Sequence, residues 1–228
     1  MNLTVVIPSR NAANLAACVR AVRQHDPGLP IIVVDDGVDW VQYIGLEPAN
    51  AQALMNAAVP GEKPFIFARN ANLGMEAAGD DDVILLNDDA QLENYCGFSL
   101  LQSAWNQSHG YGIIGAVTNL TGQPLQMRRP ITGTPRDLRE VPHIAFVCVF
   151  IPRRTINQVG YLDERYICGY EDRDYCEMVS AAGLKIGVHD GCFVDHASLV
   201  STVRGPSGKG YDRAGAQTFA DKWKGVTA

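Results

Sequence analysis

Short apolar segments alternate with helical patterns through the first half of the chain. The apolar segments of strand length are residues 3–7, 31–34, 65–68 and 83–86. Between the first two, Leu15, Cys18, Val19 and Val22 repeat at i, i+3, i+4 and i+7, which predicts a helix. Three further helical segments are predicted at residues 49–58, 74–79 and 92–108. This alternation predicts parallel strands buried beneath helices, with their carboxyl ends at one ligand-binding edge of the sheet.

The pattern changes in the second half, where strands and loops dominate. Strands are predicted at residues 111–118, 144–151, 184–188 and 192–194, and helices at 171–182 and from the end of a glycine-rich loop (201–215) to about Lys224. A polar connection, residues 119–143, is of the long kind that usually serves function. The chain therefore reads as one mixed α/β domain.

Composition and charge narrow the class of protein. The chain has 228 residues, of which 46% are hydrophobic and 19% charged, as in globular proteins. Its longest apolar run, residues 144–151, is far shorter than the roughly 20 residues of a membrane-spanning helix, and residues 1–8 have no signal-peptide pattern. We therefore expect a cytoplasmic protein, with peripheral membrane contact left open. The net charge of -6 argues against a nucleic-acid partner.

Acidic clusters follow predicted strand ends and open a predicted helix. They are Asp35-Asp36-Gly37, Asn87-Asp88-Asp89 and Glu171-Asp172-Arg173-Asp174. A carboxylate at the end of a parallel strand can reach a ribose, a base or a cation, and paired carboxylates suit a hard divalent ion. Each cluster alone also fits a turn or a helix cap. Three on one edge favour a binding site.

Several nucleotide and hydrolase motifs are absent from the sequence. Residues 8–11 follow the first strand without the GxGxxG of dinucleotide-binding proteins. The sequence also contains no GxxxxGK[ST] phosphate loop and no GxSxG nucleophile elbow. Dehydrogenases, P-loop ATPases and α/β-hydrolases are therefore disfavoured.

Seven short motifs, taken in order, resemble the inverting family 2 glycosyltransferases of the GT-A fold. They are VVIPSRN (5–11), IVVDDG (32–37), RNANLG (69–74), LLNDD (85–89), GYLDERY (160–166), GYEDRD (169–174) and VDH (194–196). The resemblance spans residues 3–196. It implies a Rossmann-like nucleotide-sugar-binding half (1–110) and an acceptor-side half (111–228) around a mixed central sheet.

The resemblance also assigns residues to the nucleotide-sugar donor. Pro8 and Ser9 would line the nucleotide pocket with Arg10 nearby, Asp36 would accept a hydrogen bond from the base, and Arg69 would lie on the base edge. Asp88 would bind the ribose or the donor sugar. Arg69 also fits a surface residue.

The metal and the catalytic base follow from the same resemblance. Asp89 and His196 would bind Mn²⁺ or Mg²⁺, and Asn87 at the first position of the DxD-type motif would leave one carboxylate fewer. Asp172 would be the base that deprotonates the acceptor, with Glu171 as the alternative. Both acids lie in a first helical turn, whose dipole favours the carboxylate form. They also fit ordinary first-turn acids, and His196 a half-buried histidine.

The glycine-rich loop adds a cationic feature outside these motifs. It carries Arg204 and Lys209, which we expect to contact the donor phosphates; a plain surface loop is the alternative.

Together these features predict a metal-dependent inverting glycosyltransferase. Its donor would be a nucleotide-diphosphate sugar, with UDP the first candidate and GDP and dTDP open. Its acceptor would be a hydroxyl of a glycan or glycolipid. The alternatives are glycosylation of a modified base in DNA and a catalytically silent nucleotide-sugar-binding module.

Overall fold

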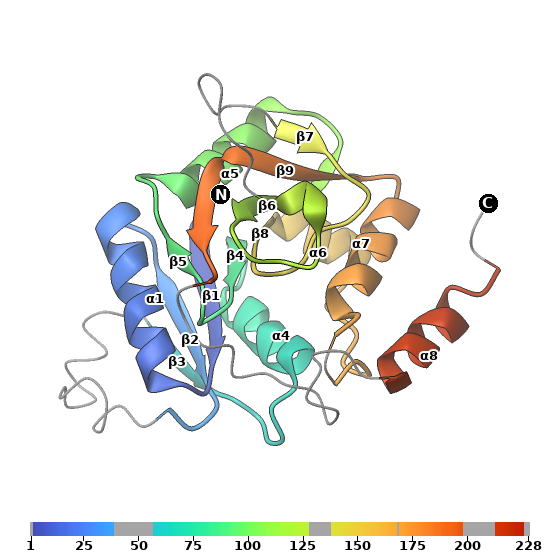
Figure 1. Ribbon diagram of the computed structural model, residues 1–228, viewed down its shortest axis with the longest axis horizontal. Helices are drawn as coiled ribbons and strands as arrows, with labels where there is room; N and C mark the ends of the chain where they lie inside the picture. Colours follow the sequence, from blue (N-terminus) through green and yellow to red (C-terminus); the bar gives the residue numbers. More distant parts are fainter. Residues whose placement is uncertain (1, 39–56, 128–137, 168, 198–212, 226–228) are drawn as a thin grey trace.

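The computed structural model describes residues 2–38, 57–127, 138–167, 169–197 and 213–225. Helices and strands alternate through most of this length (Figure 1). The strands are β1 (Leu3–Ser9), β2 (Ile31–Asp35), β3 (Ala57–Pro60), β4 (Asp82–Leu86), β5 (Gln91–Leu92), β6 (Tyr111–Thr118), β7 (Leu138–Glu140), β8 (Cys148–Ile151) and β9 (Lys185–Asp195). The helices are α1 (Ala12–His25), α4 (Phe67–Ala77), α5 (Gly97–Gln107), the 3₁₀ turn η1 (Pro124–Gln126), α6 (Arg153–Val159), α7 (Glu171–Ala181) and α8 (Arg213–Lys222).

One mixed sheet joins the two predicted halves of the chain. Its order is β3-β2-β1-β4-β8-β6-β9-β5, with β7 paired to β9. The first four of these strands are parallel, as predicted, and β8 is antiparallel to both of its neighbours. Strand β6 runs parallel to β9. Strands from residues 1–110 and from residues 111–228 therefore hydrogen-bond to each other at β4 and β8.

Two hydrophobic cores lie on the two faces of this sheet. Successive strand residues alternate between them: Val5 and Ile7 pack with α1 and α5, whereas Val6 packs with α4, α6 and α7. Since both faces are covered, the central strands are apolar at nearly every position, which explains why they were recognisable as apolar runs.

Strand β5 positions the chain that follows β4. Residues 87–90 form a turn, closed by a hydrogen bond from Ala90 N to Asn87 O of 3.2 Å. The next two residues then pair with the end of β9, Gln91 opposite Asp195 and Leu92 opposite Val194. The turn after β4 is thereby held beside the residue that follows β9.

The third predicted strand is wrong, because helix α4 begins within it. Residues 65–68 were predicted as a strand, but α4 begins at Phe67 and takes in the helical segment predicted at 74–79. Its buried residues Ala68, Ala71 and Met75 follow the helix period, which outweighs the short apolar run. A Cβ at Gly74 would meet Val6 Cγ1 and lie 2.9 Å from Val34 Cγ2, so a glycine lets this helix approach the sheet.

The third strand is β3 instead, and other boundaries also shift. The predicted helix 49–58 is wrong at residues 57 and 58, which belong to β3; residues 49–56 lie outside the described part. The predicted helix 92–108 begins only at Gly97, because residues 91–92 pair with β9. The loop predicted over 201–215 is helical from Arg213.

Two predicted strand boundaries are also corrected in the second half of the chain. The strand predicted over 144–151 pairs only from Cys148, so residues 144–147 are free of the ladder. The two strands predicted at 184–188 and 192–194 are one strand, β9, with a register shift opposite Ala116 and Val117. The polar connection 119–143 contains η1 and β7.

The last helix docks on α7 through one buried carboxylate. Asp174 is fully buried and accepts hydrogen bonds from Tyr166 Oη (3.0 Å), Lys222 Nζ (2.7 Å) and Trp223 Nε1 (2.8 Å). Lys222 also reaches Asp163 at 3.0 Å. Helix α8 lies at the periphery of the fold, and this network ties it to the first turn of α7 (Figure 1).

Candidate active site

The ends of β1 and β4 bring Ser9 and Asp88 together. These strands are parallel neighbours, and Ser9 Oγ donates a hydrogen bond of 2.6 Å to Asp88 Oδ2. Burial raises the pKa of Asp88 to about 6, and the charge of Asp89 adds to this, while the hydrogen bonds from Ser9 and the Arg10 backbone oppose it. Loss of hydration therefore outweighs hydrogen bonding at this carboxyl group.

Asp89 lies in the β4–β5 turn and meets His196. His196 follows β9 directly, and its Nε2 lies 3.0 Å from Asp89 Oδ1. Asn119 fixes this segment: its Oδ1 accepts from His196 N (2.9 Å) and its Nδ2 donates to Asp195 Oδ1 (2.9 Å). The pairing of β5 with β9 thus builds the Asp89–His196 contact.

A second contact fixes the tautomer of His196. The Leu120 carbonyl lies 2.8 Å from Nδ1, and because a carbonyl can only accept, Nδ1 carries a proton. Burial lowers the pKa of His196, but the hydrogen bond to Asp89 and its charge outweigh burial and leave the pKa raised. The other nitrogen, Nε2, is the one directed at Asp89.

A left-handed turn begins the helix that carries the third acidic cluster. Gly169 and Tyr170 have φ values of 83° and 77°, and α7 begins at the next residue. A non-glycine residue in this region is strained, which is common at functional sites. The turn places Glu171 and Asp172 in the first helical turn, as predicted.

The surroundings of Glu171 and Asp172 favour the protonated, uncharged form of each side chain. Burial raises the pKa of Asp172, against hydrogen bonds from the Arg173 and Phe146 backbones and the charge of His143. Burial and the charge of Asp172 raise the pKa of Glu171 to about 8. The helix dipole was expected to favour the ionised forms, but it contributes only about 0.3–1 kcal/mol, and burial outweighs it at both carboxyl groups.

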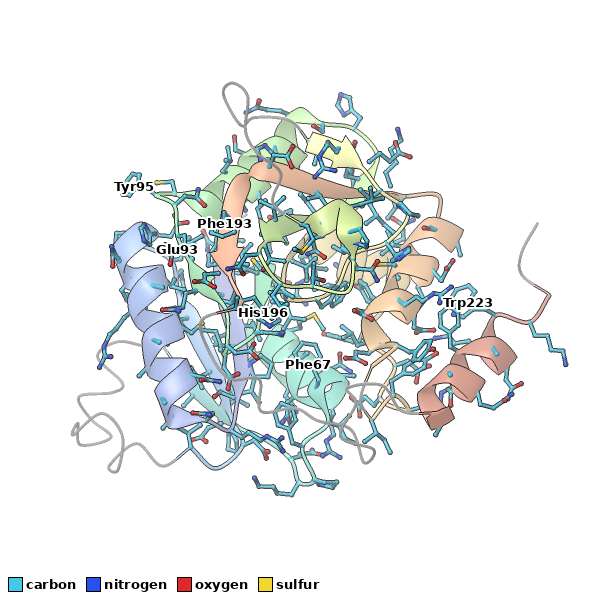
Figure 2. The ribbon with its side chains drawn as sticks, in the orientation of Figure 1. Phe67, Glu93, Tyr95, Phe193, His196 and Trp223 are labelled. Carbon is cyan, nitrogen blue, oxygen red and sulfur yellow. The ribbon has the colours of Figure 1, made fainter. Side chains whose placement is uncertain are left out.

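One cavity of about 180 Å³ collects most of these groups. It is lined by Pro8, Phe65, Phe67, Asn87, Asp88, Asp89, Ala145, Phe146, Val147, Glu171, Asp172 and His196. In Figure 2 the labelled His196 lies close above Phe67 of α4 in the centre of the molecule. The cavity therefore joins the ends of β4 and β9 to the start of α7.

The donor set of this cavity fits a hard divalent cation in part. Asp89 and His196 supply an oxygen and a nitrogen within 3.0 Å of each other, and the buried Asn87 Oδ1 has no hydrogen-bond partner. In the described part of the chain, no group of three His, Cys, Asp or Glu side chains is arranged to hold a metal ion. Among the described residues, the candidate metal ligands are therefore the Asp89 and His196 side chains, with the amide oxygen of Asn87 as a third candidate.

Asp36 lies outside the residues that line the cavity, in a buried position of its own. Its backbone N–H donates to Ser9 O at 2.8 Å, and its carboxylate pairs with Lys63 Nζ at 3.1 Å. The side chain is 1% exposed, and Oδ2 has no hydrogen-bond partner. Asp35 has a different role, since its Oδ1 accepts from Gly37 N and Val38 N and caps the turn.

The two predicted arginines lie near the cavity rather than on its wall. The guanidinium of Arg10 stacks at 5.1 Å over the ring of Phe65, which does line the cavity. Arg69 donates from Nη2 to the Glu62 carbonyl (2.8 Å) and to that of Pro64, and its Nε lies 3.3 Å from the Glu62 carboxylate. Its guanidinium therefore holds the turn before α4.

Several residues of the site were not found from the sequence. Phe65, Phe67 and Phe146 line the cavity, and His143 acts on Asp172. Phe65, Phe67 and Phe146 were placed inside predicted strands, and no motif marks His143. The predicted phosphate-contacting residues Arg204 and Lys209 lie outside the described residues.

Comparisons with known proteins rest on structure alone. No protein-family model matches the chain, and no curated protein matches its sequence. The structure resembles that of GalNAc-T7 crystallised with UDP, GalNAc and Mn²⁺, with a TM-score of 0.67 and 15% identity over 86% of this chain. The fold is that of the GT-A glycosyltransferases.

A second group of neighbours has the same fold. S. aureus TarS, residues 1–349, matches with a TM-score of 0.59 and 13% identity over 85% of this chain. The same fragment in complex with UDP-GlcNAc matches with a TM-score of 0.59 and 14% identity over 88% of the chain. This GT-A chain spans about half the length of its neighbours, 44% of the GalNAc-T7 chain and 62% of the TarS fragment. Among the described helices, none has the length and apolar character needed to cross a membrane.

Proposed function

We propose that this protein is a metal-dependent inverting glycosyltransferase of the family 2 type. It moves a sugar from a nucleotide-diphosphate donor, UDP first, to a hydroxyl group of a glycan or glycolipid. The observation that carries the proposal is the convergence of Asp89, His196 and Asp172 on one cavity. The UDP, UDP-GlcNAc and Mn²⁺ in structures of the neighbours support the choice of donor and cofactor.

The donor half of the site binds the nucleotide and its diphosphate. Asp36 accepts a hydrogen bond from the base, and Lys63 beside it offers a donor to a base carbonyl. An imide edge, with N–H next to C=O, satisfies both side chains, as uracil, thymine and guanine would. Pro8 and Asp88 line the cavity between this position and the metal ligands.

Asp89 and His196 would hold Mn²⁺ or Mg²⁺. When bound, the cation neutralises charge on the leaving diphosphate. Nδ1–H of His196 stays on the Leu120 carbonyl, which presents the Nε2 lone pair to the ion once Nε2 is deprotonated. The unpartnered Asn87 Oδ1 lies on the same cavity as a further oxygen donor.

Asp172 carries out the proton transfer on the acceptor side. The acceptor oxygen forms a bond to the anomeric carbon as the bond from that carbon to the diphosphate oxygen breaks, and the bonding pair leaves with the diphosphate. Asp172 takes the hydroxyl proton. One displacement on the face opposite the diphosphate inverts the anomeric centre. The backbone N–H of Arg173, 2.7 Å from Asp172 Oδ1, orients the carboxylate.

A ligand screen followed by a transfer assay tests this function. We expect UDP-sugars with Mn²⁺ to raise the Tm more than GDP-, dTDP- or CMP-sugars do. We then expect release of UDP, and transfer once an acceptor hydroxyl is supplied. Binding without any turnover, including hydrolysis, would identify a silent binding module. A gel shift on duplex DNA with glucosylated product would favour the DNA-base alternative.

A further inference from the structure

Glu171 has a buried oxygen that nothing in the protein satisfies. The side chain lines the cavity, and its Oε2 is buried without a hydrogen-bond partner in the described part of the chain. An ionised carboxylate oxygen in that position would carry charge out of water with no donor to stabilise it. A hydroxyl at Oε2 would instead be a hydrogen-bond donor on a side chain that lines the ligand space.

The two acids on α7 have different surroundings. Asp172 Oδ1 receives the Arg173 N–H at 2.7 Å, and the Phe146 backbone and the charge of His143 also stabilise its anion. The hydrogen bonds to Glu171 come from the backbone of Gly169 and from its own N–H, and they leave Oε2 bare. The anion therefore belongs on Asp172 and the proton on Glu171.

The other charged groups around the cavity also favour a proton on Glu171. Asp88 and Asp89 line the same cavity as the two α7 acids, and His196 lies 3.0 Å from Asp89. Four carboxyl groups around about 180 Å³ cannot all be ionised at moderate cost. Of the four, Glu171 is the one with an orphaned oxygen.

We infer that Glu171 is protonated at Oε2 and donates a hydrogen bond to an oxygen of the sugar or alcohol bound in the cavity, leaving Asp172 as the base. This inference rests on the proposed function and assigns Glu171 a substrate-positioning role within it. The raised pKa of Glu171, about 8 because of burial and the charge of Asp172, agrees with this protonation.

Three variants test the role of the proton. Glu171→Gln keeps the shape and a permanent N–H donor, Glu171→Ala removes the donor, and Glu177→Gln is a control on the same helix outside the cavity. At pH 7 we expect Glu171→Gln to keep kcat/KM within about threefold of wild type and Glu171→Ala to lose about tenfold, since a hydrogen bond is worth up to about tenfold. Equal losses in both Glu171 variants would overturn the inference.

The pH profile gives a readout that a purely structural role would not move. Wild-type activity should fall above about pH 8 as Glu171 loses its proton. Glu171→Gln should lack this alkaline limb, and Glu177→Gln should keep it. An alkaline limb that persists unchanged in Glu171→Gln would contradict the assignment.

Binding and infrared measurements separate this inference from the proposed function. If the hydrogen bond reaches the donor sugar, Glu171→Ala weakens UDP-sugar but not UDP; if it reaches the acceptor, donor affinity is unchanged and acceptor KM rises. The infrared difference between wild type and Glu171→Gln at pH 7 should show a protonated carboxyl band. Its absence refutes the inference even in an active enzyme, whereas a wild type that binds no nucleotide sugar refutes the proposed function.

Discussion

Nε2 of His196 lies 3.0 Å from Oδ1 of Asp89, although 107 residues separate the two in the chain. Asp89 follows β4 in the first half of the chain, and His196 follows β9 in the second half. The short β5–β9 pairing brings them together, so the contact forms only when both halves of the sheet are assembled.

Loss of either side chain should uncouple nucleotide binding from the metal. We expect His196→Ala and Asp89→Asn to weaken UDP binding in the presence of Mn²⁺ by about tenfold or more, since even supporting residues of metal sites cost 10–100-fold. Without metal, the affinity should change little. Titration calorimetry with and without Mn²⁺ measures this, with the exposed His109→Ala as control. Equal weakening in both conditions would contradict a metal-binding role.

Removal of the proposed base should separate binding from turnover. Asp172→Asn keeps the shape but cannot take the acceptor proton, so kcat should fall by about 10²–10⁴-fold. Donor affinity should stay within about twofold, because the side chain acts on the acceptor. Single-turnover transfer and donor titration are the measurements. Near-normal kcat in this variant would move the base assignment away from Asp172.

The buried carboxylate at the α7–α8 contact should contribute strongly to stability. Asp174→Ala removes the acceptor of Tyr166 and Trp223 and one of the two carboxylate partners of Lys222, and we expect a loss of about 3 kcal/mol in the free energy of unfolding. Asp221→Ala, on the exposed side of α8, should change stability by less than about 0.5 kcal/mol. Urea unfolding compares the two. Similar small effects would mean that α8 is not held by this network.

Close packing of α4 on the sheet should make Gly74 intolerant of a side chain. A Cβ there would overlap Val6 and Val34, so Gly74→Ala should cost about 1–3 kcal/mol despite the better helix propensity of alanine. Gly28→Ala is the matched control, since a Cβ at Gly28 meets nothing within 4 Å. Thermal unfolding gives the comparison, and a stabilised Gly74→Ala would show that propensity outweighs the overlap.

Asp163 should make stability depend on acid pH. The hydrogen bonds from Arg165 and, next, Lys222 hold the pKa of Asp163 well below its usual range. Because its pKa is lower in the folded than in the unfolded state, Asp163 stabilises the protein at pH values above its unfolded-state pKa of about 3.9. This stabilisation is lost as the pH falls from there toward the folded-state pKa. Asp163→Asn should therefore be less stable than wild type at pH 7, with a gap that narrows below about pH 4. Urea midpoints at pH 7, 4 and 3 measure the gap, with Asp80→Asn as the control; a constant gap would oppose the assignment.

The predictable parts of the fold are those with a strong local pattern. The central strands are apolar on both faces, and Tyr111–Thr118 was predicted to the residue. By contrast, β3 has little β-branched character, and the four apolar residues 65–68 are too few to distinguish a strand from the start of α4. The register shift that keeps β9 continuous depends on β6, which is distant in sequence.

The candidate site likewise has residues that a local sequence motif predicts and residues that depend on contacts distant in sequence. Asp89, His196 and Asp172 were predicted because the order of short motifs resembles a family, and all three line one cavity. Lys63 beside Asp36 was not found, since the contact depends on the turn before α4. Phe146 lines the cavity and is not part of the strand, because β8 begins at Cys148, four residues after the start of the apolar run.

The asparagine at position 87 has a thermodynamic consequence. If Asp89 and His196 hold the proposed cation, the diphosphate of the nucleotide would have to supply oxygen ligands that these two side chains do not. Each of the two ligands then completes the site of the other. By linkage, whatever factor the cation adds to nucleotide affinity the nucleotide returns to the cation, so each should bind more tightly in the presence of the other.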